Sequence, residues 1–553
     1  MNAQRINGLC ALLAMSITAA AAMVFNPGVL QGDLLNPDSA LRLVRLEAIL
    51  HAGAPLHAVA RDGSGAGTVL HWSHLMDSLL LLISAPAAAV VGWHEALAMV
   101  ALLFGPASMA ALGAAVGWAA APWTAPAWRW TAAVSVCLCL PIVGYGVPGV
   151  VHHHVLLVVV AVMAAGWAAR MVHAGHGGWA LGGWAAAGVW LSPEAMPLCL
   201  MALCYAWLGW LIRPSLRLAS GLAQAGGAFF LAVTAAWLAD PPMAGIWVPE
   251  VDRISIVFVT LAAAVAACGA LARAGLPRIV VAGAGSVLAL AWLGLFPALL
   301  GGAEGLMSPA EARSFFEDIT EMMPIDTLGE AVGFLSLGAI ATIVLATGAL
   351  RRRSVLLAYG AACGALLILG GAQHVRFAAY AGAFAAVLLP VALSRLGRPS
   401  MRAAVLALAF MLPQPGNLIV SADAAPAPAH TCALDGVAAL LSPYAGRVVL
   451  SGASETPELL WRTEVLTVGS HYHRNPQALM RLKAAWGGPA GDVMPPAVQA
   501  TGAHLLLVCP RPPTPSAGPT LLAALQAGTP PPWLHRIGQA GKHGYVLYGA
   551  DLP

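Results

Sequence analysis

The chain has 553 residues, of which 59% are apolar and only 9% are charged, and its mean hydropathy is +0.78. A soluble domain carries roughly 25% charged residues, so this composition excludes a soluble enzyme and a disordered protein. The net charge of +3 is small, and we expect no nucleic-acid partner. Apolar runs of about 20 residues, the length that crosses a bilayer as a helix, recur along most of the chain. The sequence therefore predicts a polytopic helical membrane protein.

The first apolar run, residues 8–25, follows Arg5 and has no clear small-residue cleavage site, so we expect a retained helix rather than a signal peptide. The polar residues 26–77 that follow predict a loop outside the bilayer. Residues 78–91 are short for a crossing. If these residues were counted as a crossing, every later arginine-containing loop would lie on the opposite side of the membrane. We therefore expect an interfacial or re-entrant helix within a first external loop over residues 26–95.

The later apolar segments bring the total to about thirteen spans. Arginines gather in alternate loops, which the positive-inside rule places in the cytoplasm. The N-terminus is then cytoplasmic, and the tail after residue 420 lies in the periplasm, outside a bacterial inner membrane. The expected later spans are 96–118, 130–147, 153–170, 177–192, 195–212, 218–238, 254–272, 279–300, 329–350, 354–371, 377–394 and 403–420.

The tail differs from the rest of the chain. A linker with the sequence AAPAPAH is followed by turn residues that alternate with the short apolar runs RVVL, HLLLVC and YVLYG. This pattern predicts a small α/β domain over residues 421–553, after a membrane domain over residues 1–420. Cys432 and Cys509 both lie in this tail, and we expect them to form a disulfide in an oxidising compartment.

Ionisable residues at the external ends of the spans are the candidate functional groups, because burying charge there is costly. In the first loop, Asp38 is either the N-cap of a helix or a functional carboxylate. His71 and Trp72, in the sequence VLHWSHLMD, either line a cavity or anchor the membrane interface. Glu194 lies in a tight external turn, a position typical of a solvated carboxylate.

Three consecutive histidines, His152 to His154, open an expected helix. Successive helical residues point about 100° apart, so we expect at most one or two of them to bind one metal ion. A late external loop over residues 301–328 carries Glu321 among acidic residues typical of a solvated face. His374 and Arg376 lie at an external helix end, where an arginine either extends to the interface or binds a phosphate.

Together these residues suggest an external cavity with carboxylates for a divalent cation and an arginine for a phosphate. Oxygen ligands suit Mg²⁺ or Mn²⁺, which neutralises a departing phosphate. An enzyme that uses a lipid-phosphate-activated donor outside the membrane would need such a set.

The order of the motifs supports this interpretation. NPDSALRLVRLEAILHAG, VLHWSHLMD, PGVVHHH, DITEMMP and HVRFAAY follow one another along the chain in a way that resembles the catalytic subunit of oligosaccharyltransferase and its bacterial relatives, among the GT-C membrane glycosyltransferases. The similarity covers most of the chain. It implies an all-α, GT-C-like membrane domain of about thirteen helices followed by a small periplasmic α/β domain.

The resemblance also implies roles for particular residues. Asp38 corresponds to the catalytic, metal-binding aspartate of the first loop, and Glu321 to the metal-binding glutamate of the late loop. Arg376 matches the arginine that contacts the lipid-linked diphosphate. In PGVVHHH, His152 or Val151 takes the place of an aspartate.

His153 and His154 match the two histidines of that motif. The missing aspartate implies a histidine-containing metal site, here including His152 and His153, or a weak dependence on metal. The Trp-Trp-Asp acceptor motif of oligosaccharyltransferases is absent from the tail. Its place is taken by PELLWRTEVLTVGSHYHRN, in which Tyr472, His473 and Arg474 either face the acceptor or belong to an ordinary strand and turn.

The sequence thus predicts a membrane glycosyltransferase that moves a sugar or oligosaccharide from a polyprenyl phosphate or diphosphate donor to an unidentified glycan, lipid or protein acceptor on the periplasmic face. Three alternatives stay open. One is a true protein oligosaccharyltransferase, which requires the altered tail to bind a peptide. Another is a polytopic transporter, which would carry its charges near the middle of the membrane. The third is a histidine-based haem or copper handler.

Overall fold

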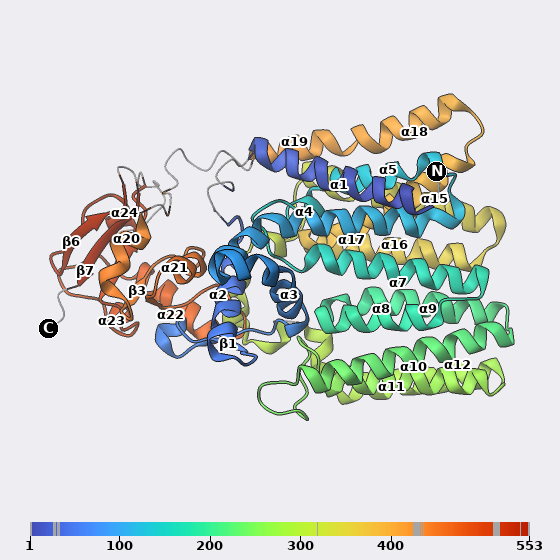
Figure 1. The fold of residues 1–553 in the computed structure, drawn as a ribbon, viewed down its shortest axis with the longest axis horizontal. Helices are drawn as coiled ribbons and strands as arrows, with labels where there is room; N and C mark the ends of the chain where they lie inside the picture. Colours follow the sequence, from blue (N-terminus) through green and yellow to red (C-terminus); the bar gives the residue numbers. More distant parts are fainter. Residues whose placement is uncertain are drawn as a thin grey trace.

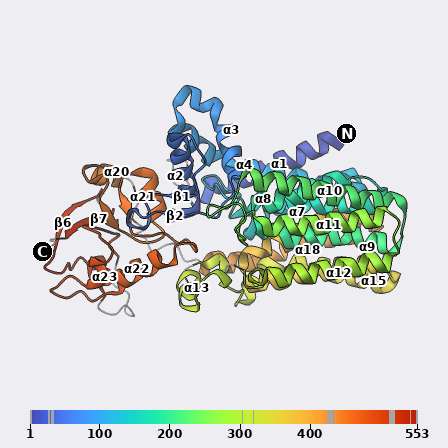
Figure 2. The same ribbon diagram turned by 90° about the horizontal axis from the view of Figure 1, so that it is seen from below.

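The fold is a bundle of long helices with a smaller domain at one end (Figure 1). The computed structural model describes residues 3–25, 29, 34–302, 304–317, 319–423, 432, 434, 436–511, 520–541 and 544–550. The elements of the first loop lie between the bundle and the C-terminal domain in Figures 1 and 2. The N-terminal end of the first helix points away from the C-terminal domain in both views, as expected if the two ends of the chain lie on opposite sides of a membrane.

Among the described residues, 11 helices are long and apolar enough to cross a membrane. This confirms a multi-pass architecture. The main helices of these segments, some of which also include adjoining short turns, are α1 (Ala3–Phe25), α3 (His74–Val91), α4 (Trp93–Ala120), α7 (His154–Ala174), α9 (Met196–Ile212), α10 (Leu216–Ala239), α11 (Ile256–Arg273), α12 (Arg278–Leu295), α15 (Ser336–Arg352), α16 (Val355–Gln373) and α17 (Ala378–Arg395).

Three of the expected spans are helical but shorter than a continuous crossing. The segment 130–147 is divided into α5 (Trp130–Cys137) and α6 (Leu140–Val143), with Pro141 in the first turn of α6. The segment 403–420 is divided into α18 (Pro399–Met411) and α19 (Pro413–Asp423). Both breaks precede a proline, which favours a helix start and cannot continue the preceding helix. The third, α8 (Gly178–Leu191), has only 14 residues.

Helix α3 is the one candidate span of the described residues that was not expected from the sequence to cross the membrane. Its 18 residues satisfy the length and composition of a span. In Figure 2, however, α3 projects from the end of the bundle beside α2 (Pro37–Ala52) instead of running parallel to α10 and α11. That the segment belongs to the first external loop stays a prediction.

Small residues let the bundle helices approach closely. A Cβ atom on Gly182 of α8 would lie 2.1 Å from the carbonyl oxygen of Ala225 in α10. A Cβ atom on Gly226 of α10 would lie 2.7 Å from the backbone of Ala266 in α11. Backbones that meet at glycine gain van der Waals contact, the main source of helix association in a bilayer. The glycines in these helices therefore fix the spacing of α8, α10 and α11.

The C-terminal domain contains a five-stranded mixed sheet in the order β4-β3-β5-β7-β6. Strand β3 is parallel to β4 and β5, while β7 is antiparallel to β5 and β6. The strands are β3 (Val448–Leu450), β4 (Leu466–Thr467), β5 (Leu505–Val508), β6 (Leu534–Gln539) and β7 (Val546–Ala550). The helices are α20 (Val437–Leu441), α21 (Thr456–Arg462), α22 (Pro476–Gly487), α23 (Pro496–Gln499) and α24 (Leu521–Gln526). Cys432 and Cys509 are joined by a disulfide with Cα atoms 5.6 Å apart.

Two neighbouring charged residues of the first loop hold this domain against the membrane domain. They follow the short strand β1 (Ala58–Val59), which pairs with β2 (Thr68–Val69). The Arg61 guanidinium donates to the carbonyl oxygens of Leu460, at 2.6 Å, and Thr463. The buried Asp62 carboxylate accepts from the hydroxyls of Thr467, at 3.0 Å, and Ser470, at 2.7 Å. These charge-assisted hydrogen bonds fix the tail domain against the first loop.

Candidate functional site

Asp38 lies in the first turn of α2 and faces the start of α7. The helix is capped by Asn36, whose side-chain oxygen accepts from the backbone N–H of Asp38 at 2.8 Å. The N-cap interpretation of Asp38 is therefore wrong, because its neighbour performs that task. The Asp38 carboxylate is instead 3.0 Å from Nε2 of His152, and its side chain is 36% exposed. The carboxylate thus has one histidine partner and remains accessible from outside.

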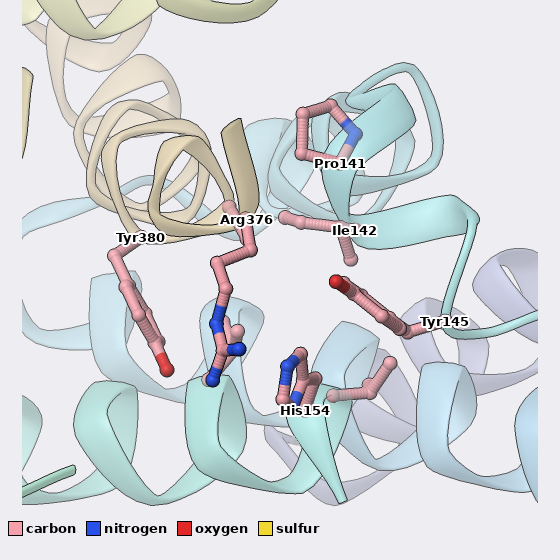
Figure 3. A pocket seen from close by; sticks show the side chains of 9 residues that line it. Pro141, Ile142, Tyr145, His154, Arg376 and Tyr380 are labelled. Atoms are coloured by element: carbon pink, nitrogen blue, oxygen red, sulfur yellow. The ribbon is translucent and has the colours of Figure 1, made fainter. Parts of the chain in front are cut away.

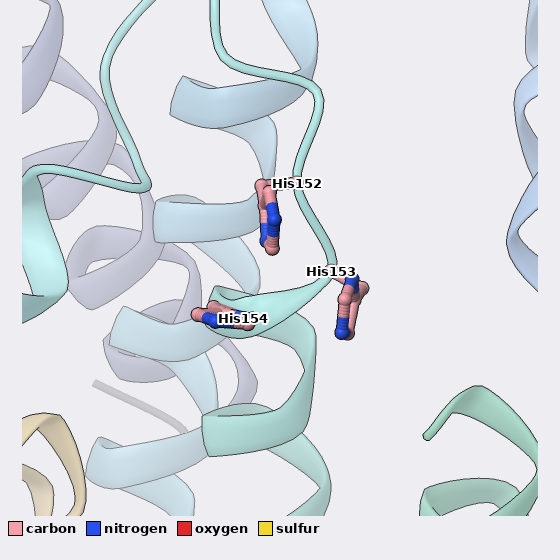
Figure 4. Close-up of side chains that lie close together, drawn as sticks. All are labelled: His152, His153 and His154. Atoms are coloured by element: carbon pink, nitrogen blue, oxygen red, sulfur yellow. The ribbon is translucent and has the colours of Figure 1, made fainter. Parts of the chain in front are cut away.

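The three histidines converge more closely than helix geometry suggests. Each offers a ring nitrogen within 4.8 Å of the others, and all three side chains are buried. Figure 4 shows His154 on helix α7 (His154–Ala174), whereas His153 is the N-cap residue of that helix and His152 precedes it. The 100° rotation per residue applies only inside a helix, so it does not limit the ligands to two. The number of these histidines that bind one ion stays a prediction.

A second group surrounds Arg376, at the N-terminal end of α17. The guanidinium of Arg376 pairs with Glu194, from the turn before α9, and lies 3.7 Å from Glu321. Tyr145 donates its hydroxyl hydrogen to Glu321, and Tyr380 donates to Glu194 at 3.4 Å. Glu194 is mostly buried, with 17% of its side chain exposed, so its interpretation as a solvated loop carboxylate was wrong. The ion pair with Arg376 stabilises the negative charge of Glu194, which solvent would otherwise stabilise.

The late external loop is fastened next to Arg376. His374 Nδ1 lies 2.7 Å from the carbonyl oxygen of Met322, and the backbone N–H of Val375 donates to Met323 at 3.1 Å. Met322 ends the 3₁₀ turn Thr320–Met322 that carries Glu321. His374, expected to contact substrate, is therefore occupied in positioning the loop. The loop also contains α13 (Pro309–Phe316), and it is followed by the one-turn helix α14 (Leu328–Glu330).

Tyr145 connects the two groups. Its ring centroid lies 5.4 Å from that of His152 and 4.4 Å from that of His154. Burial raises the pKa of Tyr145, and the adjacent Glu321 carboxylate raises it further, so its hydroxyl stays protonated. Figure 3 shows Tyr145, His154, Arg376 and Tyr380 around one pocket. The remaining walls are apolar and come from Pro141, Ile142, Val155, Val158 and Ala379.

A separate polar cluster joins the first loop to the C-terminal domain. Nδ1 of His71 is 2.5 Å from the Tyr472 hydroxyl, and Nε2 of His473 is 2.9 Å from Asp252 Oδ2. Arg474 Nε donates to the same carboxylate at 2.8 Å. Burial alone would raise the pKa of Asp252, but the hydrogen bonds from His473 and Arg474 lower it well below its usual range. This carboxylate is ionised.

Trp72, expected to contact substrate, is buried. Its ring lies beneath the guanidinium groups of Arg42 and Arg45, at 4.3 and 5.5 Å from the centroid. Both arginines also form ion pairs with Asp77, at 3.1 and 2.5 Å. The indole therefore packs under a buried charge network, where cation–π contact contributes to holding α2 against α3.

The sequence reasoning did not identify Tyr145 or Asp252 as site residues. Tyr145 lies among the apolar residues of an expected span, and nothing in that pattern distinguishes it. Asp252 belongs to the acidic stretch PEVD, which also contains Glu250 and joins α10 to α11. Two carboxylates in an external loop were the available signal. They bind Arg474, at 2.5 Å from Asp252 and 2.6 Å from Glu250.

Comparison with known proteins identifies the fold. No protein-family model matches the chain, and no curated protein matches it. Among solved structures, the archaeal oligosaccharyltransferase AglB from Archaeoglobus fulgidus, in complex with an inhibitory peptide and a dolichol-phosphate, is similar with a TM-score of 0.67 at 14% identity. That match covers 91% of this chain and 69% of the other.

Two further structures of the Archaeoglobus fulgidus oligosaccharyltransferase match with TM-scores of 0.64. The complex with Zn and sulfate has 14% identity and covers 98% of this chain and 72% of the other. The form tethered to an acceptor peptide containing the NVT sequon has 13% identity and covers 98% of this chain and 74% of the other. The chain therefore has the same fold as this oligosaccharyltransferase, as the motif order implied.

Proposed function

We propose that the chain is a membrane glycosyltransferase that moves a sugar or oligosaccharide from a polyprenyl phosphate or diphosphate donor to an acceptor on the periplasmic face. The observation that carries this proposal is the meeting of Asp38, the histidine triplet and Arg376 around Tyr145 at one end of a GT-C bundle. The oligosaccharyltransferase with the same fold binds a dolichol-phosphate. A transporter would concentrate its charges at mid-membrane rather than at this end.

The pocket beside Arg376 suits the donor lipid phosphate. Its polar end contains a guanidinium, an imidazole and two phenol hydroxyls, and its walls are aliphatic. A guanidinium binds two phosphate oxygens at once. Because Arg376 is engaged by Glu194 and Glu321, a phosphate has to displace one of these carboxylates. Glu321 is the more loosely held, since its contact with Arg376 is 3.7 Å long.

The residues around Asp38 fit a divalent cation. Both ring nitrogens of His154, and Nδ1 of His153, are buried and have no hydrogen-bond partner within the described parts of the chain. Burial lowers the pKa of His153, which keeps its imidazole neutral and able to bind metal. Imidazoles beside one carboxylate suit Mn²⁺ or Zn²⁺ better than Mg²⁺. Such an ion would neutralise charge that develops on the departing phosphate.

The chain's own side chains would then act in turn. The exposed carboxylate of Asp38 orients the acceptor nucleophile or takes its proton, while His152 holds that carboxylate in place. Arg376 holds the donor phosphate. Glu321, once displaced from Arg376, becomes free to turn toward Asp38, and the Tyr145 hydroxyl remains to guide it. The loop over residues 301–328 would close over the donor as this exchange occurs.

The acceptor would meet the C-terminal domain, where Tyr472, His473 and Arg474 face the first loop. A true protein oligosaccharyltransferase is the second candidate function. The acceptor peptide tethered to the related enzyme favours it, and the absent Trp-Trp-Asp motif weighs against it.

The experiment is complementation of a deletion strain with the wild-type gene and with Asp38→Ala. Mass spectrometry of envelope glycans and polyprenyl-linked intermediates is the readout. We expect Asp38→Ala to accumulate the donor and lose the glycan at normal membrane abundance. Glu47→Ala is the matched control, because Glu47 lies on the same helix but contacts His94 at 2.6 Å. A full glycan complement in the Asp38→Ala strain would overturn the proposal.

A further inference from the structure

A group of metal-ligand side chains lies outside the proposed catalytic site. His71 follows β2 in the first loop, Asp252 lies between α10 and α11, and His473 lies between β4 and α22 of the C-terminal domain. Each of the three offers one ligand atom within 4.8 Å of the other two. Three segments that are far apart in the sequence thus bring two imidazoles and one carboxylate to a single point.

The geometry of the group is close to that of a bound ion. His473 Nε2 and Asp252 Oδ2 are 2.9 Å apart, and the rings of His71 and His473 have centroids 4.7 Å apart. Zinc bonds of about 2.1 Å place tetrahedral ligand atoms about 3.4 Å apart. The ligand atoms of the group lie within 4.8 Å of one another, so the widest pair closes by at most about 1.4 Å, while His473 Nε2 and Asp252 Oδ2, 2.9 Å apart, open by about 0.5 Å. The side chains of His473 and Asp252 are 9% and 12% exposed, so they are largely withdrawn from water.

The neighbours of the group fix its orientation. The Tyr472 hydroxyl contacts Nδ1 of His71, which leaves Nε2 of that ring for a cation. Metal-binding histidines commonly have their second nitrogen held in this way. Arg474 contacts Asp252, but it also donates to Glu250 at 2.6 Å. Glu250 can therefore retain the guanidinium when Asp252 turns to an ion.

In a second group of candidate metal ligands, an arginine already occupies the place that a metal ion would take. His57, His74 and Asp240 also have ligand atoms within 4.8 Å of one another. There, however, the guanidinium of Arg253 lies 2.8 Å from His57 Nδ1 and 2.6 Å from Asp240 Oδ1. A permanent cation already bridges that imidazole and carboxylate. In the His71 group, Arg474 donates to the carboxylate of Asp252. Among the described contacts, no arginine donates to the imidazole of His71 or His473.

We propose that His71, Asp252 and His473 bind a zinc-class divalent cation that joins the C-terminal domain to the membrane domain. Two imidazoles and one carboxylate are ligands that favour Zn²⁺ over Mg²⁺ or Ca²⁺, and three protein ligands leave a fourth position open. The ion links the first loop, the α10–α11 loop and the tail domain. The site uses none of the ligands of the Asp38 and histidine-triplet site, although His71 and Asp252 line one pocket with His153.

The test is zinc content of the purified full-length protein in detergent, stripped with chelator and reloaded with Zn²⁺. We expect His473→Gln and Asp252→Asn each to lose about one zinc ion per chain relative to wild type. His57→Gln is the matched control and should keep the wild-type content, because Arg253 occupies its group. Wild-type zinc content in His473→Gln would overturn the proposal.

A second variant keeps the test decisive if those changes prevent folding. The combined substitution Asp38→Ala, His152→Gln, His153→Gln and His154→Gln removes the aspartate and the three histidines of the proposed catalytic metal site and leaves the new site intact. We expect this variant to retain about one zinc ion per chain and to show a zinc-dependent rise in Tm. Absence of bound zinc in a monodisperse preparation of this variant would overturn the site. Glycan transfer is read separately, so its failure and the failure of this site are distinguishable.

Discussion

Replacing Glu321 with glutamine should strengthen binding of a polyprenyl phosphate while weakening transfer. In the structure, the Glu321 carboxylate faces Arg376 at 3.7 Å and competes for the guanidinium that the phosphate needs. Glutamine removes the negative charge but keeps an oxygen that accepts the Tyr145 hydroxyl. The substitution therefore tests the competition between Glu321 and the phosphate for Arg376 while keeping the hydrogen bond that positions the loop.

The size of the effect follows from the distance and the exposure. At 3.7 Å, two unit charges attract by about 1 kcal/mol in water and about 4 kcal/mol near a protein surface. Because Arg376 and Glu321 are 19% and 32% exposed, the smaller figure applies. About 1 kcal/mol corresponds to a Kd that is about five-fold tighter.

The assay is titration of the detergent-solubilised protein with undecaprenyl phosphate, followed by intrinsic fluorescence or thermophoresis. Glu317→Gln is the control, because Glu317 lies on the same loop but contacts Lys483 at 2.8 Å rather than Arg376. We expect the control to leave the Kd unchanged. An unchanged or weaker affinity in Glu321→Gln would refute the idea that the two anions compete for one guanidinium.

Three further expectations concern stability and positioning. Arg61→Ala removes charge-assisted bonds to the tail domain and should cost about 2 to 4 kcal/mol, seen as a lower Tm; an unchanged Tm would mean that the domain docks by other contacts. Asn36→Ala should cost about 1 kcal/mol and reduce transfer, whereas Asn36→Asp should preserve both; equal transfer in the two variants would contradict capping as the reason. Burial and Arg253 lower the pKa of His57 from 6.5 to about 4, so the folded state resists protonation and stability falls as pH drops from 6.5 to 4. The Tm of His57→Gln should fall less than that of wild type over this range, and parallel curves would contradict this assignment.

Local patterns predicted much of the fold. The apolar runs corresponded to helices, and the tail runs RVVL, HLLLVC and YVLYG contain β3, β5 and β7. These features depend on the chemistry of neighbouring residues, which a sequence displays directly. Strands β4 and β6 were not anticipated. Strand β4 has only two residues, and β6 carries the mostly polar sequence LHRIGQ.

The candidate site was predictable in its composition but not in its pairings. The motif order singled out Asp38, the histidines, Glu321 and Arg376, and the structure brings them to one end of the bundle. The sequence pattern also placed the Glu194 carboxylate in solvent, although that carboxylate pairs with Arg376, 182 positions away. A partner so distant leaves no mark on the residues around either side chain.

The sequence by itself determined a polytopic helical membrane protein, because the free energy of placing apolar segments in a bilayer is set segment by segment. The fold was implied only by the resemblance of the motif order to a known family. The tertiary structure decided which of the few charged side chains form buried ion pairs and which remain exposed to solvent. Packing of α2, α7, α17 and the tail domain leaves Asp38 accessible, encloses the Arg376 group and brings His71, Asp252 and His473 together. Electrostatic energy depends on distance and burial, and both are properties of the folded chain alone.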